Sequence, residues 1–90
     1  MDAKQAVDTA TAQVEDLFGD GLDDLRLEEV ELEAEAQRWA VTFSFRRRPS
    51  RRGALVIATG RDAEAERKTL FVDDESGRVT AVRDRRTDAA

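Results

Sequence analysis

The strongest constraint on the fold is the segment from Trp39 to Phe45, in which large apolar residues alternate with small ones. This period of two, built from aromatic and β-branched residues, is typical of a β-strand. Because one face of such a strand is bulky and apolar, it has to be buried against another element of the chain. The large members of this face are Trp39, Val41, Phe43 and Phe45.

An amphipathic helix is predicted over residues 2–18, where apolar residues recur at helical spacing on one face. Asp2 can cap the first turn, with Gln5 as the second member of a capping box. The sequence Gly19-Asp20-Gly21 follows, and we expect one of these glycines to end the helix in the left-handed conformation.

A first strand is predicted over residues 25–36, and its apolar pattern changes phase across Glu28-Glu29. A β-bulge at Glu28 or Glu29 would let both halves face the core, and we favour this interpretation. The alternative is that the first half, Leu25 and Leu27, is a lead-in that covers the end of the sheet. A short turn over residues 35–38 would then join this strand to the one at Trp39.

Two more strands are expected over residues 67–73 and 78–83, joined by a tight turn that ends at Gly77. The predicted fold is therefore α+β, with one N-terminal helix packed on a four-stranded antiparallel meander sheet. We expect residues 1–84 to form a single domain and residues 85–90 to be a disordered tail.

Four segments carry a resemblance to a known family: the alanine-rich opening helix, the first strand ending in Val30-Glu31-Leu32-Glu33, the Trp39-x-Val41-x-Phe43 strand, and the hairpin from Lys68 to Val79. They resemble the PepSY-like group of small bacterial domains, within the wider set of cystatin-like sheets. The resemblance implies the fold given above and a role in inhibiting or regulating proteases. It implies no catalytic residues, because the group has no agreed ones. Members are often exported, whereas residues 1–6 do not resemble a signal peptide.

The composition excludes several kinds of chemistry. The 90 residues contain neither histidine nor cysteine, which rules out nucleophile–histidine dyads, disulfides and thiolate catalysis within this chain. No apolar run approaches the roughly 20 residues that span a membrane. We therefore expect a cytoplasmic protein without a membrane partner. Because no carboxylate pair stands out, we also expect that it is not an enzyme.

Charge is unevenly distributed along the chain. Ten acidic residues and one basic residue lie between Glu15 and Glu35, whereas five arginines and no acid lie between Arg46 and Arg52. The glutamates at 29, 31, 33 and 35 raise the possibility of a divalent-cation site, but a strand spaces such residues about 6–7 Å apart. We interpret them as a solvated face, and Asp73-Asp74-Glu75 as an ordinary hairpin turn. No metal or cofactor is predicted.

The segment from Gly53 to Gly60 contains an apolar run between two glycines. It is either a buried strand that completes the core or an exposed tip that binds a partner. Neighbouring arginines would give that tip a polar rim, and they lack the interleaved aromatic residues that stack on nucleic-acid bases. The predicted protein-binding residues are Arg47, Arg48, Arg51, Arg52, Leu55, Val56 and Ile57.

Taken together, these patterns favour a non-catalytic protein-binding or regulatory module that uses the 46–60 segment or the open face of the sheet. The alternative is a domain that binds a small ligand or a peptide on the concave sheet face. A homodimer formed through a sheet edge is a further possibility. Nucleic acid is not the expected partner.

Overall fold

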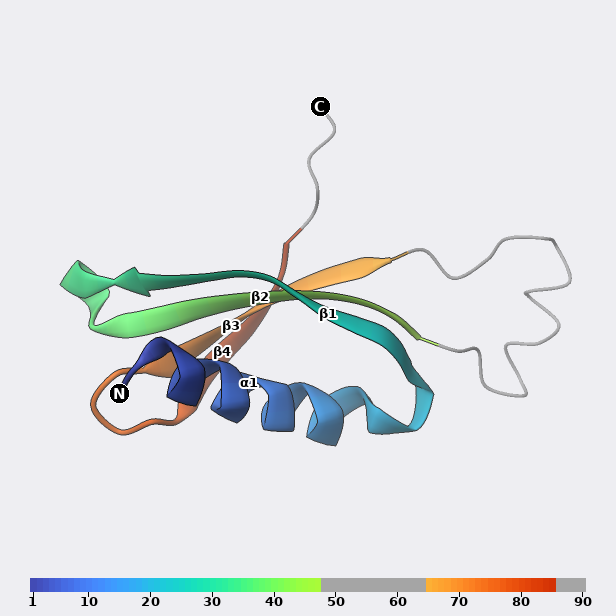
Figure 1. Cartoon of the computed structure of the whole chain (residues 1–90), viewed down its shortest axis with the longest axis horizontal. Helices are drawn as coiled ribbons and strands as arrows, with labels where there is room; N and C mark the ends of the chain where they lie inside the picture. Colours follow the sequence, from blue (N-terminus) through green and yellow to red (C-terminus); the bar gives the residue numbers. More distant parts are fainter. Residues whose placement is uncertain (48–64, 86–90) are drawn as a thin grey trace, which may run out of the picture.

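The computed structural model describes residues 1–47 and 65–85, and in them one helix lies along one face of a four-stranded sheet (Figure 1). The strands are antiparallel and lie in the order β1-β2-β3-β4, which is a meander. The predicted α+β fold is thus confirmed. Its elements are α1 (Ala3–Phe18), β1 (Leu22–Glu33), β2 (Arg38–Arg47), β3 (Glu66–Asp73) and β4 (Val79–Asp84).

Helix α1 begins with the predicted capping box. The backbone N–H of Gln5 donates to Asp2 Oδ1, and the backbone N–H of Asp2 donates to Gln5 Oε1, both at 2.8 Å. The prediction for the other end was wrong at Gly19, which is right-handed (φ −52°). There the chain tightens into a 3-10 turn, Gly19–Gly21, and the N–H of Leu22 donates to the carbonyl of Gly19. This bond satisfies the helix end without a left-handed residue.

The core lies between α1 and the sheet face that carries the alternating residues of β2. Three small helix residues, Ala6, Ala10 and Val14, have no exposed surface. Their short side chains allow the helix to approach the strands closely, and the ring of Phe18 packs against Phe45 with centroids 5.3 Å apart. The sheet contributes Val41, Phe43, Phe45, Leu70 and Val72.

Strand β1 contains the predicted bulge. Leu27 pairs with Phe43 and Glu29 pairs with Thr42, so Glu28 is the extra residue. Because directly paired residues share a face, the bulge keeps Leu27 and Val30 on the helix side of the sheet. A second irregularity lies between Asp23 and Arg26, where Asp24 has φ 56°, and it was not predicted.

The end of β1 differs from the prediction. The strand stops at Glu33, and Ala34–Ala36 form a 3-10 turn followed by the left-handed residue Gln37 (φ 53°). The N–H of Gln37 donates to the carbonyl of Ala34, which closes the turn at 3.1 Å. A turn made by alanines and a glutamine carries no glycine or proline signal, and this explains the error.

Strand β1 lies at the edge of the sheet, and α1 does not cover it fully. None of its residues is fully buried, whereas β2 and β3 supply all the buried strand residues among those described. On β1, Leu27 keeps 47% and Leu32 keeps 46% of its surface exposed. Two large apolar side chains thus remain uncovered along one edge.

We expect Leu70→Ala to lower the free energy of unfolding by about 2–5 kcal/mol, since it opens a cavity in the core. Leu32→Ala is the matched control, because the same side chain is removed from a half-exposed position, and it should cost less than about 1 kcal/mol. Urea unfolding followed by circular dichroism measures both values. Equal losses for the two variants would contradict this account of the core.

Candidate functional site

The predicted protein-binding residues fall almost wholly outside the described part of the chain. The residues outside it are the arginines Arg48, Arg51 and Arg52 and the apolar residues Leu55, Val56 and Ile57. Arg47 ends β2 with its backbone opposite Leu22. Residues 54–58, for which a core strand or an exposed tip is predicted, also lie outside the described residues.

The sheet face opposite α1 carries a shallow hollow of about 310 Å³. No helix among the described residues covers this face (Figure 1). Its floor is nevertheless buried: Ala40, Thr69 and Phe71 are each at most 8% exposed. The hydroxyl oxygens of Thr42 and Thr69 lie 2.8 Å apart and satisfy each other at the centre of the sheet.

Two arginines cover much of this floor. The guanidinium of Arg38 lies 3.8 Å from the ring centroid of Phe71, and its Nε donates to Glu33 Oε1 at 2.6 Å. Arg85 donates through Nη1 to Glu29 Oε1 at 2.5 Å and to Thr42 Oγ1 at 3.2 Å. The long side chains shield apolar and hydroxyl groups while their charged ends stay near water.

The two sides of the hollow have opposite charge. Glu29, Glu31 and Glu33 come from β1. Arg83, Asp84 and Arg85 come from the β4 side, where Asp84 is paired with Lys68. Among the described residues, Glu31 and Arg83 have no charged partner. Glu31 and Arg83 come from the two edge strands of the sheet, and they do not form an ion pair with each other. Each is free to meet a group from another molecule.

A second surface lies along the outer side of β1. We call it the β1 edge surface and define it as residues 27 and 29–33. Its helix-facing side has the half-exposed Leu27 and Leu32, and its other side has the glutamates of the hollow. In the described part of the chain, β1 has β2 as its one strand neighbour, so the backbone groups on its outer side have no strand to bond.

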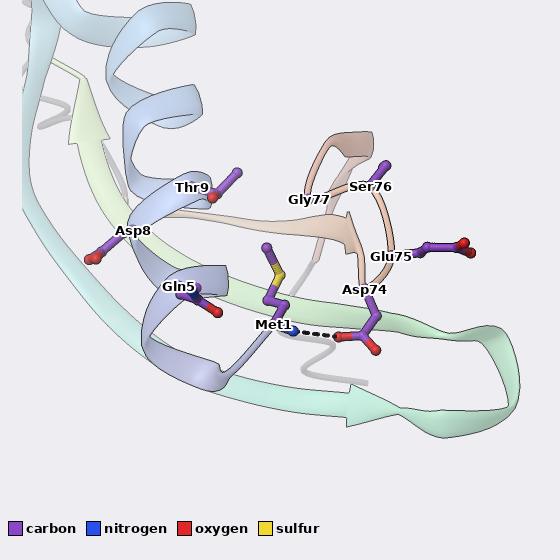
Figure 2. A pocket seen from close by; sticks show the side chains of 8 residues that line it. All are labelled: Met1, Gln5, Asp8, Thr9, Asp74, Glu75, Ser76 and Gly77. Atoms are coloured by element: carbon purple, nitrogen blue, oxygen red, sulfur yellow. Dashed lines mark ion pairs between the residues drawn. The ribbon is translucent and has the colours of Figure 1, made fainter.

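A larger hollow, of about 540 Å³, lies between the start of α1 and the β3–β4 turn. Figure 2 shows the residues that line it. Its most connected group is the Asp74 carboxylate, which accepts from Trp39 Nε1 at 2.9 Å and lies 3.8 Å from the Met1 amine. At Gly77 (φ 73°), an added Cβ would lie 3.3 Å from Met1 Cε, so the chain segments are close-packed here. These contacts join chain segments, and we interpret the hollow as a structural junction.

The β3–β4 turn is held by Asp73. The backbone N–H of Ser76 donates to Asp73 Oδ2 at 2.6 Å, and the N–H of Gly77 donates to the Asp73 carbonyl at 2.9 Å. Hydrogen bonds from Ser76, chiefly from its backbone N–H, lower the pKa of the Asp73 carboxyl below its ordinary value of 3.8. Hydrogen bonds to the ionised form favour it, so this carboxylate stabilises the turn as an anion.

No family model, no curated protein and no solved structure matches this chain in the comparisons. Within residues 1–47 and 65–85, no three potential metal ligands of the side chains are grouped so that they could hold an ion. The same residues include no helix with the length and apolarity needed to cross a bilayer.

Sequence reasoning did not single out Leu27, Leu32 or Arg83. The pattern placed the two leucines on the core side, which is correct, and gave no measure of how far the helix reaches across the sheet. One signal was present in the sequence. A helix rich in alanine has short side chains, so it covers little of a strand in which glutamate alternates with leucine. Arg83 and Arg85 belong to no sequence motif. Only the meander topology places them across the hollow from the β1 glutamates.

We expect Asp73→Asn to lower the melting temperature at pH 7. The folded pKa of Asp73 is depressed, so its contribution is present above about pH 4 and is lost as the pH falls through the lowered value. The difference from wild type should therefore shrink when melts are repeated at decreasing pH below 3.8. Glu75→Gln, which removes a charge from the same turn, is the control. A difference that stays constant with pH would contradict this role.

Proposed function

We propose that the chain is a non-catalytic protein-binding module and that it contacts its partner through the β1 edge surface. The observation that carries this proposal is the pair Leu27 and Leu32, each nearly half exposed on one side of an edge strand. Large apolar side chains that stay in contact with water at a sheet edge are typical of a surface that another molecule covers.

The surroundings of these leucines support a protein partner. An interface generally has an apolar centre and a polar rim, and here glutamates lie on the other side of the same strand. The two hollows are shallow and lined largely by charged or polar groups, whereas small-molecule pockets are mostly apolar and enclosed. A flat, mixed surface is better suited to a folded or extended polypeptide.

A regulatory role, such as the protease regulation that the PepSY-like resemblance implies, would use this same surface to contact the regulated protein. A chain without cysteine needs no oxidising compartment to fold, which is compatible with the cytoplasmic location that we propose.

We expect the double variant Leu27→Glu/Leu32→Glu to bind its partner at least about tenfold more weakly than wild type, because buried apolar residues carry much of an interface's affinity. Proteins captured from the host lysate by the immobilised wild type would be identified, purified and titrated against each variant. Leu17→Glu is the matched control, since Leu17 is 48% exposed on α1 and is not part of the β1 edge surface.

Circular dichroism has to show that both variants stay folded. If the folded double variant binds as well as wild type, or if Leu17→Glu weakens binding equally, the β1 edge surface is not the contact.

A second candidate function is the binding of short peptides or small zwitterionic ligands on the open sheet face. The opposite charges of Glu31 and Arg83, which have no charged partner among the described residues, favour it. A ligand of this kind should raise the melting temperature of wild type through preferential binding to the folded state. Glu31→Gln and Arg83→Gln should each remove that rise. A rise that both variants retain would exclude this site.

A further inference from the structure

We propose that the β1 edge surface takes up an extended segment of its partner as a fifth strand, and that basic residues alternate with apolar residues in this segment. The inference deepens the proposed function and rests on it. It names the backbone geometry and the side-chain chemistry of the partner, which the exposed leucines alone do not give.

The backbone of β1 is suited to strand addition over one part of its length. From Glu29 to Glu33 its pairing with β2 proceeds residue by residue, from Glu29 opposite Thr42 to Glu33 opposite Arg38. Both register shifts of β1 lie before this stretch. Five residues in regular register match the usual length of a strand, about 5–6 residues. The outer side of this stretch has no strand beside it in the described part of the chain.

Side chains alternate along this stretch between the two faces of the sheet. Val30 and Leu32 lie on the helix side, where their β2 neighbours are Val41 and Trp39. Glu29, Glu31 and Glu33 lie on the open side. Residues directly opposite each other on neighbouring strands interact most strongly, so an added strand should place apolar groups beside Leu32 and positive charges beside the glutamates.

Glu31 contributes most to this charge preference. Glu29 is engaged by Arg85 and Glu33 by Arg38, whereas Glu31 has no charged partner among the described residues. Glu31 is also an exposed side chain in the middle of the regular stretch. A lysine or arginine of the partner opposite Glu31 would form an ion pair without breaking one inside this protein.

The same glutamates disfavour a second copy of the chain as the occupant. A two-fold axis at this edge would pair β1 with β1 in antiparallel orientation, and the three glutamates on the open side would then face one another. Like charges directly opposite each other destabilise a strand pair. The edge of β4 is a weaker candidate, because its pairing with β3 contains a register shift and it includes none of the most exposed apolar side chains.

The test uses three synthetic peptides of about seven residues with blocked ends. The first alternates lysine with valine or leucine. The second has the same composition with its lysines clustered, and the third alternates glutamate with the same apolar residues. NMR titrations of the isotope-labelled full chain would measure the affinity of each peptide and locate the backbone amides that shift or become protected from exchange.

We expect the alternating lysine peptide to bind at least about fivefold more tightly than the clustered one and to protect amides of residues 29–33. The glutamate peptide should not bind wild type. Glu31→Lys should weaken the binding of the lysine peptide and allow the glutamate peptide to bind. Glu15→Lys on α1 is the matched control and should change neither affinity. A higher salt concentration should weaken the binding of the lysine peptide, because salt screens the attraction between opposite charges.

Strand addition is overturned if the lysine peptide does not bind, if it binds no better than the clustered peptide, or if the protected amides lie outside β1. It is also overturned if sedimentation shows a dimer that Leu27→Glu/Leu32→Glu dissociates, since a second copy would then cover the edge. These results are separable from the proposed function. A captured partner that is lost with the leucine double variant would support a protein-binding module even where strand addition fails.

Discussion

The structure depends on the contact between a helix of small apolar residues and the large apolar face of β2. Ala6 and Ala10 have no surface exposed, and they bring the helix axis close to Val41 and Phe43. A narrow helix face of this kind covers the central strands well and the outer strands poorly. The buried residues of the sheet accordingly come from β2 and β3. The exposure of Leu27 and Leu32 is a direct consequence of how the core is built.

Much of the fold could be predicted because its signals are local. The period of two at Trp39–Phe45 and the capping box at Asp2 and Gln5 each depend on residues a few positions apart. The bulge at Glu28 was also visible, since the change of phase in β1 has to be absorbed somewhere if both halves face the core. The second irregularity, near Asp24, was missed because it leaves no equally clear trace in the apolar pattern.

The candidate site was less predictable, because it depends on distances between strands. Glu31 and Arg83 are 52 positions apart in the sequence. Only the meander order of the strands places them on opposite sides of one hollow. The sequence patterns favoured the arginine cluster together with Leu55 and Ile57, and most of these residues lie outside the described part of the chain. The degree to which α1 leaves β1 uncovered is a property of packing, and no local motif encodes it.

The Asp74 carboxylate has a consequence for spectroscopy. It accepts a hydrogen bond from the indole of Trp39 and lies beside the Met1 amine, so three distant parts of the chain meet at one oxygen. Trp39 is the single tryptophan of the protein. Its fluorescence emission therefore monitors one defined end of the molecule without any introduced label. Rapid-mixing experiments that follow this emission would report when the β3–β4 turn docks against β2 during folding.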